Sequence, residues 1–78
     1  MNMSPKQLIA VTRLMGKFNI RDIDIPDSSF DPIILSCVPS TGDERIEIDV
    51  YGDGRHSAWR ESGKEIDMSK LHKYVLPA

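Results

Sequence analysis

Residues 45–60, RIEIDVYGDGRHSAWR, decide the fold. From 45 to 51, polar side chains alternate strictly with Ile46, Ile48 and Val50. Because successive side chains of a strand point to opposite faces, this pattern predicts a half-buried strand with one apolar face and one polar face.

The hairpin that follows this strand has two candidate registers. Asp53-Gly54 favours a two-residue turn, which places Trp59 opposite Ile48 in the core. The same register sets Arg60 opposite Glu47 on the polar face. A turn one residue longer would instead place Trp59 opposite Glu47. We prefer the two-residue turn and therefore expect Trp59 to be a core residue.

The N-terminal segment carries the signals of an amphipathic helix. Ser4 and Gln7 are spaced as a capping box, with Pro5 at the first helical position. Gly16 is a stop signal, so the helix is predicted over residues 5–16. Apolar residues at helical spacing are expected to face the core: Leu8, Ile9, Val11, Leu14, Met15 and Phe18.

The other segments read as short strands and turns. Residues 18–25 are predicted to be extended, with an irregularity at Arg21-Asp22. A buried strand is expected over 33–38, loops at 26–29 and 40–43, and a short hairpin arm at 64–66. Asp67 is a candidate cap for a helix over 68–75. We therefore predict a single α+β domain over residues 1–78. In it, an N-terminal helix packs on a small, mainly antiparallel sheet of three or four strands and a short C-terminal helix follows.

Composition limits the function classes. The 78 residues have a formal net charge of −2, so the strongly basic balance of a dedicated nucleic-acid binder is absent. The sequence has one cysteine, Cys37, which favours a reducing cytoplasm over secretion. No apolar run approaches the ~20 residues of a membrane span, so no membrane association is expected.

No motif in the sequence predicts catalysis. Cys37 lies in an apolar run, typical of a buried, inert thiol. His56 and His72 have no partner at metal-ligand spacing. Strand alternation and turn chemistry explain Asp49 and Asp53 better than a metal site does. We therefore expect a non-enzymatic protein without a catalytic residue, metal or cofactor.

Charge is distributed unevenly along the chain. Residues 1–21 hold four basic residues and no acid, whereas residues 22–53 hold nine acids and one base. An acidic strand face can attract a basic partner and speed their encounter. This pattern favours a regulator or inhibitor of a basic, nucleic-acid-handling protein. The expected contact residues are Asp43, Glu44, Glu47, Asp49, Tyr51 and Asp53.

Two alternatives stay open at this stage. The chain could be a small nucleic-acid-binding domain whose contacts are Lys6, Arg13, Lys17, Lys70 and Lys73. Equally, the acidic face could serve only to keep the protein in solution. Small size without a catalytic motif is also typical of a phage or mobile-element accessory protein, and pairing of an edge strand could form a homodimer.

Overall fold

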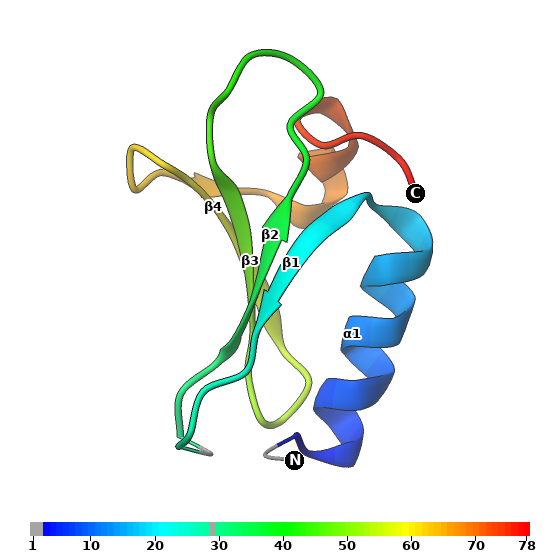
Figure 1. Cartoon of the computed structure of the whole chain (residues 1–78), viewed down its shortest axis with the longest axis vertical. Helices are drawn as coiled ribbons and strands as arrows, with labels where there is room; N and C mark the ends of the chain where they lie inside the picture. The colour runs from blue at the N-terminus through cyan, green and yellow to red at the C-terminus, as the bar shows by residue number, and fades with distance from the viewer. Residues whose placement is uncertain (1–2, 29) are drawn as a thin grey trace.

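A computed structural model describes residues 3–28 and 30–78. The strands form one antiparallel sheet with the order β1-β2-β3-β4-β5 (Figure 1). The predicted α+β class is confirmed, with five strands in place of three or four. The elements, in chain order, are α1 (Pro5–Lys17), β1 (Ile20–Asp24), β2 (Ile33–Cys37), β3 (Ile46–Val50), β4 (His56–Arg60), β5 (Glu65–Ile66) and the 3-10 helix η1 (Met68–Lys73).

The capping box at the start of α1 is confirmed. The Ser4 hydroxyl accepts a hydrogen bond from the Gln7 amide at 3.0 Å, and Gln7 Oε1 accepts one from the Ser4 amide at 2.9 Å. The helix ends one residue later than predicted, at Lys17, and the Phe18 amide donates to the Leu14 carbonyl. Local capping chemistry therefore fixes the start of α1.

The predicted core face of α1 was partly wrong. Leu8, Ile9 and Met15 are exposed, between 46% and 53%. The buried positions are Gln7, Ala10, Val11 and Leu14. The reason is Gln7, whose Nε2 donates to the buried Val50 carbonyl at 3.1 Å. Gln7 can occupy a buried position because its hydrogen bonds are satisfied there. The helix is therefore oriented with Gln7 toward the sheet, which leaves Leu8, Ile9 and Met15 at the surface.

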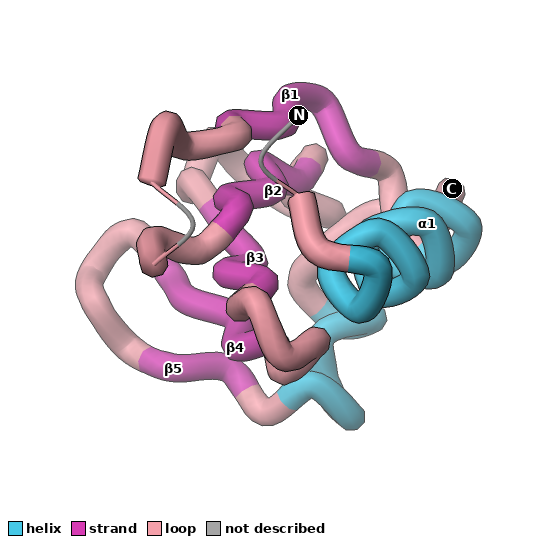
Figure 2. Tube along the Cα trace, turned by 90° about the horizontal axis from the view of Figure 1, so that it is seen from below, coloured by secondary structure: helices cyan, strands magenta, loops and turns pink. Residues whose placement is uncertain are grey.

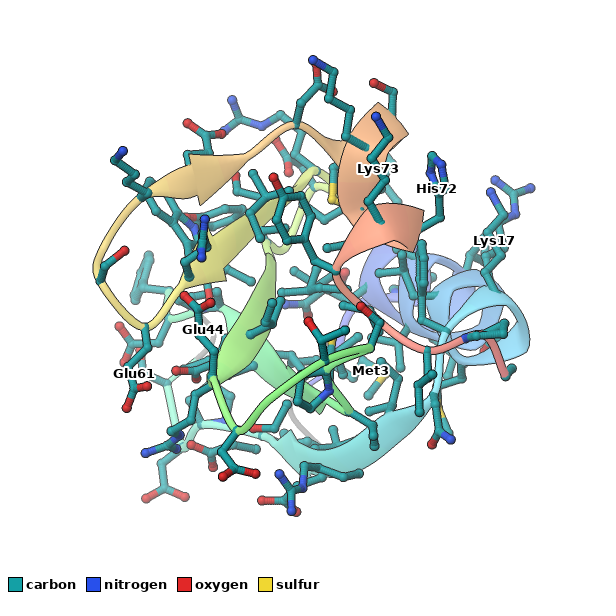
Figure 3. The ribbon with its side chains drawn as sticks, turned by 90° about the horizontal axis from the view of Figure 1, so that it is seen from above. Met3, Lys17, Glu44, Glu61, His72 and Lys73 are labelled. Carbon is teal, nitrogen blue, oxygen red and sulfur yellow. The ribbon has the colours of Figure 1, made fainter. Side chains whose placement is uncertain are left out.

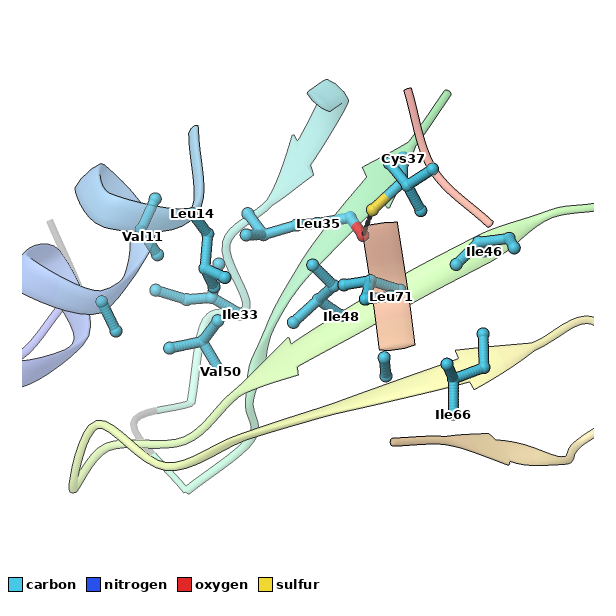
Figure 4. Close-up of a cluster of buried hydrophobic side chains, with 13 residues drawn as sticks. Val11, Leu14, Ile33, Leu35, Cys37, Ile46, Ile48, Val50, Ile66 and Leu71 are labelled. Atoms are coloured by element: carbon cyan, nitrogen blue, oxygen red, sulfur yellow. Dashed lines mark hydrogen bonds between the residues drawn. The ribbon is translucent and has the colours of Figure 1, made fainter. Parts of the chain in front are cut away.

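Both helices lie on one side of the sheet (Figure 2). The core fills the space between these layers, with Val11 of α1 facing Ile33 and Val50 at one end (Figure 4). At the other end Leu71 of η1 lies beside Ile48 (Figure 4). One sheet face is therefore buried, and no described helix covers the other.

The irregularity predicted in the first extended segment is confirmed. The pairing of β1 with β2 shifts register between Ile20 and Asp22, as in a β-bulge. β1 and β5 are the edge strands of the sheet. A bulge and charged side chains such as Asp22 and Asp24 are typical protection of an edge against further pairing.

The preferred hairpin register was wrong. Tyr51 N–H donates to the Arg55 carbonyl at 2.8 Å, which leaves a loop over 52–54. A two-residue type I′ turn needs positive φ at both central residues, and no described non-glycine residue has positive φ, Asp53 included. Gly54 alone in this loop adopts it, at 90°. The longer turn therefore forms and shifts β4 by one residue.

This shift reverses the two faces of β4. Ala58 pairs with Ile48 and is fully buried, whereas Trp59 pairs with Glu47 on the uncovered face. Arg60 stands opposite Ile46, so the expected pair with Glu47 does not form. A change of one residue in a turn thus moves the large aromatic side chain out of the core.

The predicted cap and short C-terminal helix are both confirmed, although the helix ends two residues earlier than the predicted residue 75. Asp67 Oδ1 accepts a hydrogen bond from the Ser69 amide at 3.0 Å. The helix is a 3-10 helix that stops at Lys73, because Val75 then pairs with Pro39 in a β-bridge. Ser29 of the predicted loop over 26–29 lies outside the described residues. Within the described ranges, no helix has the length and apolar character needed to cross a membrane.

Candidate interaction surface

The uncovered side of the sheet, here called the open face, consists of two rows of side chains that follow from the strand register. Partners across antiparallel strands share a face, so each row crosses neighbouring strands. The first row runs through Asp22, Ser36, Glu47, Trp59 and Glu65, and the second through Asp24, Ile34, Asp49 and Ser57. The open face therefore carries carboxylates on β1, β3 and β5.

Sequence reasoning found part of this acidic set. Glu47 and Asp49 were predicted from the alternation in β3. Asp22, Asp24 and Glu65 were missed as members of it, because their place depends on pairings across β1 and β5. The bulge in β1 also hides the alternation that would have revealed its two aspartates.

The open-face carboxylates are crowded rather than paired with cations. Burial raises the pKa of the Asp49 carboxyl, and the nearby charge of Glu47 raises it further. Within the described residues, neither side chain forms an ion pair. Arg21 and Arg45 lie with Asp22 and Glu47 around a depression at one end of the first row. These two arginines therefore place positive charge beside Asp22 and Glu47.

Trp59 lies in the first row between Glu47 and Glu65. Its side chain is half-buried, and its Nε1–H is covered without an acceptor among the described residues. Together with Ile34 of the second row, it gives the open face an apolar component. The face thus combines negative charge with one large aromatic side chain.

The other predicted contact residues are spread over different parts of the molecule. Tyr51 extends the polar side of β3 and is half-buried, and Asp43 is exposed in the loop before β3. Asp53 lies in the hairpin loop and accepts a hydrogen bond from Arg55 Nε at 2.7 Å. The two hydrogen bonds from Arg55, first from its backbone and then from its side chain, lower the pKa of the Asp53 carboxyl.

Glu44 is separated from Glu47 and Asp49. Both its carboxylate oxygens accept hydrogen bonds from Arg60 at 2.8 Å, which lowers the pKa of the Glu44 carboxyl. Arg60 pairs with Ile46 on the covered side of the sheet, and its guanidinium lies 5.4 Å from the centre of the Tyr74 ring. Glu44 is therefore already neutralised by a cation of its own chain.

The basic residues of the alternative nucleic-acid-binding hypothesis also lie at different places on the molecule. Lys6, Arg13 and Lys17 line a groove beside the β3–β4 hairpin. Lys70 lies in a different depression, next to Arg60 and Tyr74. Seen from above, Lys17 and Lys73 lie on the opposite side of the molecule from Glu44 and Glu61 (Figure 3). These two lysines thus lie apart from these two glutamates.

Two further observations concern the thiol and possible metal ligands of the described residues. Cys37 is buried, and burial followed by the charge of Glu47 raises the pKa of its thiol to about 11. Across residues 3–28 and 30–78, no group of three or more His, Cys, Asp or Glu side chains could hold a metal ion. Comparison with family models, curated proteins and solved structures gives no match to this chain.

Proposed function

We propose that this protein is a non-enzymatic interaction module that binds a basic surface of a partner protein through the open face. The observation that carries the proposal is the gathering of Asp22, Asp24, Glu47, Asp49 and Glu65 on the sheet face that no described helix covers. Opposite charge on two surfaces speeds their encounter and sets their orientation.

The spacing of the carboxylates supports a partner that recognises repeated negative charge. Neighbouring strands lie about 4.8 Å apart, so Asp22 and Glu47, two strands apart, have backbones separated by roughly 10 Å. Glu47 and Asp49 are about 7 Å apart along β3. Nucleic acid likewise presents a series of negative charges along its backbone to the proteins that bind it. The partner class we propose is therefore a nucleic-acid-handling protein, which this module would regulate or inhibit.

Trp59 supports a specific contact over a purely solubilising face. Tryptophan is over-represented among the residues that contribute most to binding at protein interfaces. Burial, followed by the nearby charge of Glu47, raises the pKa of the Asp49 carboxyl, and holding this carboxylate charged at neutral pH therefore opposes folding. A face kept only for solubility gains nothing from placing these charges side by side.

The experiment uses an arginine-rich decapeptide as the basic probe. Trp59 is the single tryptophan of the chain and lies within the open face, so its emission reports contact there directly. The double variant Glu47→Gln/Asp49→Asn should slow association and weaken binding by several-fold at low salt. Added salt should reduce the difference from the wild type, because it screens the same charges.

A matched variant separates location from net charge. Asp31→Asn/Glu61→Gln removes two exposed carboxylates that lie outside the two rows. This variant should bind the peptide almost as the wild type does. Equal weakening in both double variants, or peptide binding without a change in Trp59 emission, would refute a specific role of the open face.

A further inference from the structure

A second surface feature lies between α1 and the tip of the β3–β4 hairpin. It is an open groove of about 510 Å³. The hairpin tip lies beside the N-terminal part of α1 (Figure 1). Ala10 and Leu14 of α1 contribute an apolar floor, and basic side chains line both walls. One wall carries Lys6, Arg13 and Lys17 of α1. The other carries His56, the first residue of β4, and Arg55, which directly precedes it.

The cations of α1 form a row along one flank of the helix. Lys6, Arg13 and Lys17 are separated by seven and four residues, which brings them to nearly the same side of an α-helix. At a rise of 1.5 Å per residue, the row is about 16 Å long. All three side chains are exposed, and within the described part of the chain none forms an ion pair. A row of this length is suited to a chain of charges rather than to one compact anion.

Contacts between the two walls hold the groove open in a defined shape. Ser4 Oγ donates a hydrogen bond to the Gly52 carbonyl at 2.7 Å. At Gly54, an added Cβ would lie 3.3 Å from Lys6 Cβ, so the hairpin tip packs closely against the first turn of α1. The basic side chains of the two walls are thus presented by a scaffold that is already assembled, which lowers the entropic cost of binding.

Arg55 contributes positive charge to the groove from the hairpin, although it also forms an ion pair with Asp53. Its side chain is 82% exposed and forms an ion pair with Asp53 at 2.7 Å. This pair lies at the surface, where such interactions contribute little and exchange easily. Asp53 is the one acidic side chain among the groove residues, so the groove carries a clear excess of positive charge.

We propose that this groove binds the backbone of single-stranded nucleic acid. One strand of a duplex carries one phosphate per about 3.4 Å of helix axis, and neighbouring phosphates are farther apart than this because the strand winds around the axis. A row of about 16 Å is still long enough to meet more than one phosphate of a strand. A flexible strand can follow a concave groove and place bases against its apolar floor, whereas a stiff duplex cannot bend into it. The lining residues of the groove include no Trp, Tyr or Phe on which bases could stack, so binding should be weak, tolerant of sequence and strongly dependent on salt.

This site is separate from the open face. α1 lies on the covered side of the sheet, whereas the acidic rows lie on the other side. Binding of a strand in the groove therefore neither requires nor excludes a basic partner on the open face. Failure of one proposal leaves the other intact.

The test measures the fluorescence anisotropy of a labelled ten-nucleotide oligothymidine on addition of the full chain. If the four Lys and Arg side chains of the groove each contact a phosphate, the slope of log K against log salt concentration should be about −3. Arg13→Gln/Lys17→Gln should weaken binding about tenfold or more at low salt and flatten the slope by about 1.4. The matched variant Lys64→Gln/Lys70→Gln removes the same charge from the depression beside Tyr74 and should bind as the wild type does.

Competition experiments identify the source of the anion. Unlabelled oligothymidine should displace the probe better than a duplex, tripolyphosphate or a decaglutamate peptide at equal charge concentration. Absence of binding would overturn the proposal. Equal losses in both double variants would reduce the effect to net charge, and equal competition by tripolyphosphate or decaglutamate would contradict a strand-specific groove.

Discussion

Cys37 illustrates how one residue links the core to the open face. Its side chain is 2% exposed, and its Sγ lies 3.9 Å from the Leu35 carbonyl oxygen. Burial raises its pKa to about 11, and the charge of Glu47 contributes to this shift. A thiol in this setting stays protonated and is a poor nucleophile, in agreement with the sequence-based expectation of an inert buried cysteine.

The raised pKa of Cys37 predicts a loss of stability at alkaline pH. An unfolded cysteine ionises near pH 8.5, whereas the folded one resists ionisation up to about pH 11. The contribution of this group is therefore complete below about pH 8.5 and is lost as the pH rises toward 11. Urea unfolding between pH 7.5 and 10.5 should show the free-energy difference between wild type and Cys37→Ala shrinking as pH rises. A constant difference would contradict the burial of the thiol.

Trp59 gives a second prediction at this scale. Its Nε1–H has no acceptor among the described residues, so its replacement by phenylalanine breaks no hydrogen bond. Trp59→Phe should change the free energy of unfolding by less than about 1 kcal/mol, since removal of an unpaired polar group offsets part of the lost area. A loss clearly above ~1 kcal/mol in urea unfolding, which a cavity left in a fully packed site would cause, would place Trp59 back in the core.

At the scale of elements, local sequence signals predicted which helices and strands form better than they predicted how the hairpin strands pair. The capping box and the Asp67 cap each depend on residues three or fewer positions apart, and both were predicted correctly. The hairpin register depends on which residue of the turn adopts positive φ, and Asp-Gly allows more than one answer. The face of α1 depends on Gln7 reaching Val50 across the core. Strand register and the choice of the buried helix face thus depend on interactions that the local sequence pattern alone does not determine.

Gly54 tests the observed turn and the contact of the hairpin with α1 together. With φ at 90°, any residue with a Cβ is strained there by about 1–2 kcal/mol. Gly63 has the same φ but open space around an added Cβ, so Gly63→Ala is the matched control. Gly54→Ala should therefore lower stability in urea unfolding more than Gly63→Ala does. Equal losses would show that the contact with Lys6 contributes nothing.

At the scale of the whole molecule, the fold turns an uneven sequence into separate charged surfaces. The run of acids at 22–53 predicted an acidic surface in general terms. It did not predict that Glu44 would be neutralised by Arg60 or that β1 and β5 would add carboxylates to the open face. Those assignments depend on strand order and on a one-residue bulge. The grouping of Lys6 with Arg55 likewise follows from the packing of the hairpin against α1.

The most direct test of the central claim maps where a basic partner binds. The measurement is a ¹H–¹⁵N NMR titration of the labelled chain with the arginine-rich decapeptide. We predict that the largest amide shifts fall on the open face, at Asp22, Ser36, Glu47, Asp49 and Trp59, while α1 stays unperturbed. Largest shifts along α1, or shifts scattered over the whole surface in proportion to exposed acids, would contradict the claim that the open face is the binding surface.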